Sequence, residues 1–225
     1  QQKFDKIIAY CDKLKINYLF TPLSHDWVDY IKKNSKNIKI ASGDLNFNYL
    51  IRKIIQNNFN IILSTGASNL KEIQKTFKII KSKYGKQTSN KLVIMHCVSK
   101  YPVPDEEASL SSIVLLKEKF NLTIGYSNHV IGINACLASI CMGARVIEFH
   151  FTDNKKRKFR DHQLSLDKSD VTKMIKIGNN YIKLIGKYEK EINKKIQLEK
   201  NSLSKGIIVN KNLKTNQKIK MNDLS

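Results

Sequence analysis

The sequence is poor in glycine and proline, with nine and three of these residues among 225. Their scarcity excludes collagen-like and linker-like proteins, which depend on repeated glycine or proline. The chain also lacks a run of about 18 apolar residues, the length that a membrane-spanning helix needs. No hydrophobic segment of the signal-peptide kind lies near the start of the sequence. We therefore expect a cytoplasmic protein with no membrane association.

Cysteine is also sparse. The four cysteines, Cys11, Cys97, Cys136 and Cys141, form no Cys-x-x-Cys pair. A chain of this length can bury a sufficient core without disulfides. We expect the four residues to be reduced thiols, and their spacing does not favour a zinc site.

Acidic residues are half as numerous as basic ones, 19 against 40, and the formal net charge is +21. Only four of the basic residues are arginine, and the lysines are spread along the chain with one dense run at 155–160. No aromatic RNA-binding motif or zinc-finger spacing is present, so we expect no nucleic-acid partner. The electrostatic field of this positive charge would attract a small anionic substrate. A non-catalytic basic α/β protein that binds a polyanion or nucleic acid is the alternative hypothesis.

Short apolar runs alternate with segments of helical periodicity, which is typical of a parallel α/β sheet. The six predicted strands are 17–23, 38–44, 60–66, 92–98, 123–129 and 145–152. The predicted helices are 45–58, 68–84 with Ser68 as N-cap, 109–120, 131–142 and 170–185. This order suits a doubly wound sheet or part of a (β/α)₈ barrel, and no glycine-rich nucleotide-binding motif follows any strand.

Polar residues gather at the carboxyl ends of the predicted strands, where barrel enzymes build their active sites. Residues of alternate positions share a face of a strand, which places Ser127 with His129 and Glu148 with His150. If the two strands are neighbours, both histidines project inward at matching depth. Two imidazoles so placed can share one divalent metal. Glu148 could instead serve a structural role by pairing with Lys39 or Arg145.

The ordered blocks of the sequence resemble the sialic acid synthase family. They read TPLS at 21–24, KIASGD at 39–44, ILSTG at 62–66, HCVSKYPVP at 96–104, GYSNH at 125–129, GARVIEFHFT at 143–152 and DH at 161–162. The resemblance implies an α/β fold, a (β/α)₈ TIM barrel of which six of eight strands are present, followed by a small antifreeze-like (SAF) domain. We therefore expect a partial barrel at 1–190, a linker at 191–202 and the start of an antifreeze-like domain at 203–225.

The resemblance also implies a reaction. Members of the family condense phosphoenolpyruvate with an N-acetylated amino sugar and water, giving a nonulosonic acid and phosphate with cleavage of the C–O bond. The acceptor would be N-acetylmannosamine or a diacetylated hexose. Mn²⁺ or Mg²⁺ would be the cofactor, and the full-length protein would be a homodimer.

Individual roles carry over by matching positions. The implied metal ligands and catalytic residues are His129 and His150, with Asp44 as a catalytic carboxylate near the acceptor. The implied phosphoenolpyruvate contacts are Lys39, Ser42, Thr21, Ser64, Ser99 and Ser127, and the implied sugar contacts are Tyr101 and Asp161. Three features depart from the family pattern: Asn128 stands where Asp is usual, Ser99 stands where several members have Asn, and the loop at 158–160 reads KFR. Because this loop faces the sugar in the family, the acceptor is left open.

Overall fold

The computed structural model describes residues 2–187, 189–192 and 194–225. The chain divides into two compact units, Gln1–Ile185 and Gly186–Ser225. The larger unit contains the candidate site. In the part of the chain that the structure describes, no helix is both long enough and apolar enough to cross a membrane.

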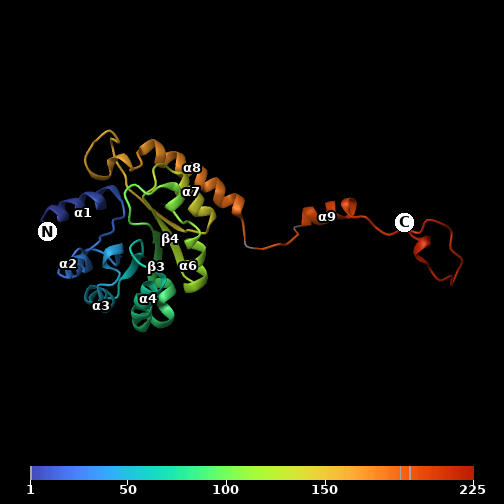
Figure 1. Cartoon of the computed structure of the whole chain (residues 1–225), viewed down its shortest axis with the longest axis horizontal. Coiled ribbons are helices and arrows are strands. Elements are labelled where there is room, and N and C mark those ends of the chain that lie inside the picture. Colours follow the sequence, from blue (N-terminus) through green and yellow to red (C-terminus); the bar gives the residue numbers. More distant parts are fainter. Residues whose placement is uncertain (1, 188, 193) are drawn as a thin grey trace. The chain divides into compact units, whose positions relative to one another are not determined.

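The larger unit is built on a parallel sheet in which each strand pairs with the next one along the chain. Within the described residues its five strands are β1 (Asn37–Ile40), β2 (Asn60–Ser64), β3 (Leu92–Cys97), β4 (Thr123–Asn128) and β5 (Val146–Phe149). Helices connect the strands and lie around the outside of the sheet (Figure 1). This arrangement is a parallel α/β half-barrel, and it brings the carboxyl ends of all five strands to one edge.

The strands form because their apolar runs are buried. In β1, Ile38 and Ile40 are fully buried, whereas Lys39 between them points to the opposite face with its side chain 16% exposed. Ile61 and Leu63 repeat the buried pattern in β2. Burying one such side chain contributes about 1.5–3 kcal/mol. The alternation therefore directs the polar residues of these strands toward the inside of the half-barrel.

Five of the helices lie within the predicted helical segments or extend them by two residues. They are α3 (Asn48–Gln56), α4 (Leu70–Tyr84), α6 (Ser112–Phe120), α7 (Asn134–Cys141) and α8 (Lys168–Ile185). The N-cap of α4 is Asn69, not the predicted Ser68. The Asn69 side chain accepts a hydrogen bond from the Glu72 N–H while the Glu72 carboxylate accepts one from the Asn69 N–H. This reciprocal pair satisfies two N–H groups that a Ser68 cap would leave open.

The prediction of six strands was wrong at its first member. The structure assigns no strand to 17–23 and shows only a single bridge between Phe20 and Ile38. Pro22 follows closely and has no N–H to offer a neighbour, so pairing stops there. Two helices that the sequence analysis did not predict, α1 (Gln2–Leu14) and α2 (Trp27–Asn34), flank this segment.

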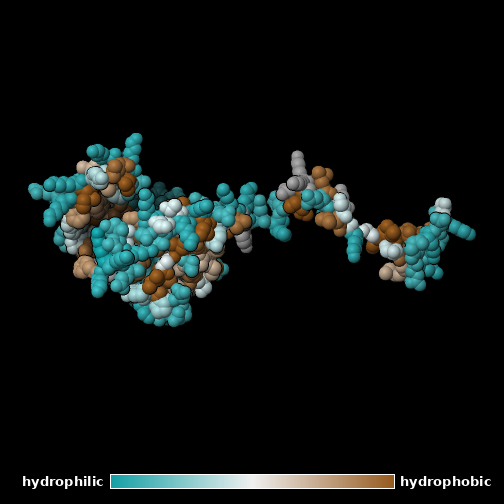
Figure 2. All heavy atoms as spheres, turned by 90° about the horizontal axis from the view of Figure 1, so that it is seen from above, coloured by the Kyte–Doolittle hydropathy of each residue, from teal (hydrophilic) through white to brown (hydrophobic). Residues whose placement is uncertain are grey.

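The second unit is small. It contains α9 (Lys194–Leu203), and reciprocal backbone hydrogen bonds join Ile208 to Ser225. Asp223 is buried and forms an ion pair with Lys211. Three large apolar side chains of this unit, Leu203, Ile207 and Met221, are each at least 80% exposed, and Figure 2 shows apolar surface on it. The assignment of 203–225 to an antifreeze-like domain stays a prediction.

Candidate active site

Two histidines lie side by side at the carboxyl ends of β4 and β5. The register pairs Ser127 with Glu148 and Asn128 with Phe149, so His129 and His150 follow at matching positions. Their ring centroids are 5.3 Å apart. The structure therefore confirms that the two histidines lie at matching depth, as the alternation of residues along the two strands predicted.

His129 is 4% exposed, and its ring is held from behind. Its Nδ1 lies 2.8 Å from the Val98 carbonyl oxygen, a contact that requires the proton on Nδ1 and leaves the Nε2 lone pair free. Burial lowers the pKa of His129, with the nearby His150 adding to the effect, although the Val98 hydrogen bond opposes it. The neutral ring with a free Nε2 is the form that binds metals.

Two loop residues complete the surroundings of the histidine pair. Tyr101, on the loop after β3, packs against His129 with ring centroids 4.0 Å apart and meets His150 edge-on at 5.8 Å. Asp161, on the loop after β5, places Oδ2 3.6 Å from the His150 Nδ1. The structure therefore brings together all four residues expected to serve the metal and the sugar.

A charged cluster lies next to the pair, inside the half-barrel. Oε1 of Glu148 lies 3.4 Å from Nζ of Lys39 and accepts a hydrogen bond of 2.9 Å from the Ser127 hydroxyl. The structural role considered for Glu148 is thus observed, with Lys39 as the partner. A lysine beside serine hydroxyls is suited to bind phosphate or carboxylate groups.

Two further serines lie at the carboxyl ends of their strands: Ser42 follows β1, and Ser64 is the last residue of β2. The Ser42 hydroxyl accepts a hydrogen bond of 3.0 Å from the Gly66 N–H. A Cβ on Gly66 would lie 2.7 Å from the Ser99 Oγ, so only glycine permits this approach. The buried hydroxyl of Ser64 has no hydrogen-bond partner among the described residues. A buried polar atom without a partner is costly unless a ligand or water satisfies it.

Three candidate residues are less closely involved. Thr21 is exposed and lines an apolar pocket of about 180 Å³ together with Phe4 and Trp27. Among the described residues, no contact joins Thr21 to the histidine pair. Ser99 is exposed at the rim. Asp44 lies in the 3₁₀ turn Ser42–Asp44 after β1, where burial raises the pKa of its carboxyl group.

Sequence reasoning missed the contribution of Cys97. Its neighbour His96 points away from the site and bonds the Ala108 carbonyl oxygen, whereas Sγ of Cys97 lies 3.8 Å from the His129 Nδ1. Burial raises the pKa of the Cys97 thiol, and hydrogen bonds from Ser127 and Ser42 oppose that shift. The alternation of residues along 92–98 was the available signal, because it puts Cys97 on the face opposite His96, and the observed register pairs Cys97 with Ser127.

The residues present fit a divalent metal in part. His129 offers a free Nε2, and the Asp161 carboxylate beside His150 is the kind of partner that orients a metal-binding imidazole. Among the described residues, however, no group of three His, Cys, Asp or Glu side chains is placed to hold an ion. Two histidines would therefore bind an ion incompletely, as expected for a site that stays open to substrate.

A model of the NeuB family matches residues 1–190. The chain belongs to the NeuB family. This match confirms the resemblance from which the predicted roles were carried over. The matched residues include every candidate site residue named above.

One of two similar curated proteins is named as a synthase, and the other is uncharacterized. The chain is 33% identical over 210 residues to the N,N'-diacetyllegionaminic acid synthase of Campylobacter jejuni, covering 93% of this chain and 62% of that protein. It is 37% identical over 191 residues to a protein of Methanocaldococcus jannaschii, covering 84% and 56%. The chain thus spans 56–62% of the length of these curated relatives.

The fold has a close counterpart among solved structures. The N-acetylneuraminic acid synthetase of Leptospira borgpetersenii, solved in complex with citrate, superposes with a TM-score of 0.81 at 28% identity. The match covers 88% of this chain and 70% of that one. The half-barrel of this chain is therefore shared with a sialic acid synthetase.

Proposed function

We propose that this chain forms the catalytic part of a synthase that condenses phosphoenolpyruvate with an N-acetylated amino sugar and water. The observation that carries the proposal is that His129 and His150 contact each other, Tyr101 and Asp161. Two residues earlier on the same strands, Ser127 and Glu148 contact each other, and Glu148 pairs with Lys39. Membership of the NeuB family and the named synthases among the relatives support it.

The reaction balances without an oxidant or reductant. Carbon 3 of phosphoenolpyruvate attacks the aldehyde carbon of the open-chain sugar, and the aldehyde oxygen takes up a proton. Water adds to carbon 2 and loses a proton. The bond between carbon 2 and the phosphate oxygen then breaks, the added hydroxyl gives up its proton as the keto group forms, and inorganic phosphate leaves with that oxygen and takes up a proton. The product is a nine-carbon 2-keto acid.

The phosphoenolpyruvate side of the site would be Lys39 with the hydroxyls of Ser42, Ser64 and Ser127. The Lys39 ammonium supplies the charge that a phosphate or carboxylate needs, and hydroxyl donors add direction. Ser64 supports this role because its buried hydroxyl is otherwise unsatisfied among the described residues. Thr21 and Ser99 are kept in the proposal on the family pattern alone.

The acceptor side would be Tyr101 and Asp161, and we take the acceptor to be a diacetylated hexose. The Campylobacter relative that covers nearly all of this chain is named for a diacetylated product. The loop at 158–160 departs from the family pattern on this side. Asp44 would hold or release a proton near the acceptor, since burial raises its pKa. N-acetylmannosamine is the competing acceptor.

His129 and His150 would hold the metal ion, Mn²⁺ or Mg²⁺. When bound, such an ion supplies Lewis-acid polarisation of the aldehyde oxygen. The protein's own part is to orient the imidazoles: the Val98 carbonyl oxygen accepts a hydrogen bond from Nδ1 of His129, and the Asp161 carboxylate lies beside Nδ1 of His150. A closed eight-stranded barrel, an antifreeze-like domain, a homodimer and a cytoplasmic location complete the proposal for the full-length protein.

The metal role can be tested by His129→Ala in the full-length protein. We expect Mn²⁺ binding, measured by titration calorimetry, to be lost and turnover to fall at least about a hundredfold, because even the groups that hydrogen-bond to metal ligands contribute about 10–100-fold. His25→Gln is the matched control, since His25 pairs with Asp26 and belongs to no part of the site. Unchanged Mn²⁺ binding in His129→Ala would contradict the proposed ligand set.

A further inference from the structure

The segment between β5 and α8 is a loop whose two ends are joined. The Leu166 N–H donates to the His150 carbonyl oxygen at 2.7 Å, and the Thr152 N–H donates to the Leu166 carbonyl oxygen at 2.9 Å. Residues 153–165 therefore leave and re-enter the same point of the fold. Compact loops closed in this way are frequently functional. This one starts directly after the site histidine His150 and carries Asp161.

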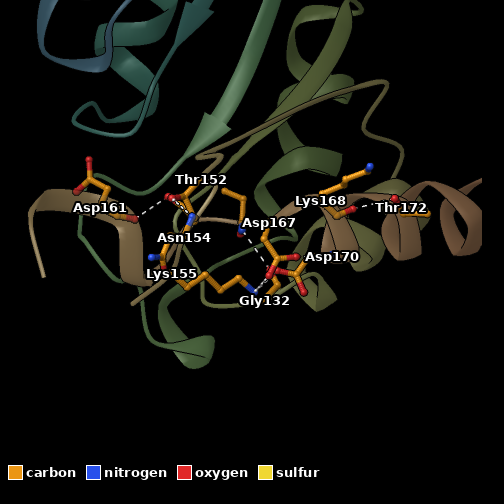
Figure 3. Close-up of polar contacts among 11 residues, drawn as sticks. Gly132, Thr152, Asn154, Lys155, Asp161, Asp167, Lys168, Asp170 and Thr172 are labelled. Carbon is orange, nitrogen blue, oxygen red and sulfur yellow. Dashed lines mark hydrogen bonds and ion pairs between the residues drawn. The ribbon is translucent and has the colours of Figure 1, made fainter. Parts of the chain in front are cut away.

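Lys155 ties the loop to the start of α8. Its ammonium group contacts the Asp170 carboxylate and lies 3.4 Å from Oδ2 of Asp167 (Figure 3). The two aspartates cap the helix reciprocally: the Asp170 N–H donates to Asp167 at 2.9 Å and the Asp167 N–H donates to Asp170 at 3.1 Å. A helix N-terminus repels a cation by itself. Lys155 therefore lies there because of the two carboxylates.

The contacts continue from Lys155 to Asp161. The Thr152 hydroxyl is buried, accepts a hydrogen bond of 3.0 Å from the Asn154 N–H, and lies 2.8 Å from Nδ1 of His162. On the returning side, the Ser165 hydroxyl donates to the Asp161 carbonyl oxygen at 2.7 Å. Both halves of the loop are thus anchored, and the Asp161 carboxylate is left facing His150.

We propose that Lys155 is a positioning residue for the acceptor side of the site: by fastening the loop to the cap of α8, it keeps Asp161 beside His150. The inference rests on the proposed function. It predicts that the two substrates are affected separately, because Lys39, Ser127 and Glu148 lie on β1, β4 and β5 and are held by contacts with one another. Releasing the loop should weaken acceptor binding and leave phosphoenolpyruvate binding unchanged.

The same loop contains a matched control. Arg157 and Asp153 form an ion pair of 2.7 Å with side chains 52% and 69% exposed. This pair is local to the loop, and exposed pairs of this kind contribute little to stability. Arg157→Met removes one positive charge from the loop without touching its anchor on α8, whereas Lys155→Met removes the same charge and the anchor.

The experiment uses the full-length protein with Lys155→Met, Lys155→Arg and Arg157→Met. Phosphate release is followed while acceptor and phosphoenolpyruvate are varied separately, with the diacetylated hexose and N-acetylmannosamine as acceptors. For Lys155→Met we expect the acceptor KM to rise about tenfold and the phosphoenolpyruvate KM to stay within about twofold. Lys155→Arg should recover most of the loss, because it keeps the charge near both carboxylates, and Arg157→Met should match the wild type.

Amide hydrogen exchange provides a second readout that does not need turnover. Lys155→Met should speed exchange at 153–163 and leave β4 and β5 protected. Unchanged exchange in the loop, or faster exchange with an unchanged acceptor KM, would overturn the inference. A rise in both KM values would also overturn it, since it would indicate a general loss of structure. If the wild type releases no phosphate with either sugar, the proposed function fails, while the exchange data still decide whether Lys155 holds the loop.

Discussion

Oε1 of Glu148 lies 3.4 Å from Nζ of Lys39, and the two side chains come from strands at opposite edges of the five-stranded sheet. The contact therefore spans the inside of the half-barrel. Glu148 also accepts a hydrogen bond from Ser127. One carboxylate thus contacts two of the groups that would bind the anionic substrate, Lys39 and Ser127.

Removing that carboxylate should weaken phosphoenolpyruvate binding. Glu148→Ala releases both Lys39 and Ser127, and we expect the phosphoenolpyruvate KM to rise about tenfold, equivalent to about 1.4 kcal/mol. Glu148→Gln keeps an oxygen for Ser127 and loses the ion pair, so its KM should lie between those of Glu148→Ala and the wild type. Steady-state kinetics with phosphoenolpyruvate as the varied substrate decide the order. A wild-type KM in both variants would contradict the role.

The side-chain amide of Asn128, which stands where the family usually has Asp, should contribute to the stability of the fold. Its Nδ2 donates to the Val130 carbonyl oxygen at 2.9 Å, and its Oδ1 accepts from the Val130 N–H and from the Tyr126 hydroxyl. A carboxylate cannot donate to Val130, so we expect Asn128→Asp to lower the free energy of unfolding by about 1–3 kcal/mol. Chemical denaturation measures this loss.

The control for that change is Asn90→Asp, which makes the same substitution at an exposed position. We expect it to shift the free energy of unfolding by no more than about 0.5 kcal/mol. Equal stability of Asn128→Asp and Asn90→Asp would show that the turn carrying His129 does not need the amide donor.

The sequence predicted the inner face of β4 and β5 correctly because alternation is a local property of a strand. It could not choose between Lys39 and Arg145 as the partner of Glu148, since that choice depends on curvature across five strands. The contact between Lys155 and the start of α8 also could not be predicted from the sequence. It joins a charged loop to a helix cap 12–15 residues later, and in a chain so rich in lysine no local pattern distinguishes that residue. The predicted first strand is absent because its segment pairs with β1 only through the single bridge between Phe20 and Ile38.

The pH dependence of stability should report on His96. This ring is 6% exposed and bonds the Ala108 carbonyl oxygen, and burial lowers its pKa in the folded state. The unfolded chain then binds more protons than the folded one as pH falls below about 6.5, so stability declines there. His96→Gln removes this contribution. We expect its melting temperature to fall less than that of the wild type between pH 7.5 and 5.5, and equal falls would contradict the assignment.

Gly125 should tolerate no side chain. A Cβ there would lie 2.2 Å from Sδ of Met95 and 2.7 Å from the Val146 carbonyl oxygen. Met95 can move, but the backbone of β5 cannot without disturbing the strand that carries Glu148. We expect Gly125→Ala to destabilise the fold by about 1–3 kcal/mol. Gly43→Ala, where no atom lies within 4 Å of the added Cβ, serves as the comparison in thermal unfolding.

The measurement that tests the central claim most directly is phosphate release from phosphoenolpyruvate by the full-length protein. The diacetylated hexose and N-acetylmannosamine are compared, each with Mn²⁺ and with a chelator. The account predicts release that requires both a sugar and the metal, fastest with the diacetylated hexose, and incorporation of ¹⁸O from phosphoenolpyruvate labelled at the bridging oxygen into the phosphate. Folded protein that releases no phosphate with either sugar, or that releases it equally well without one, would contradict the account.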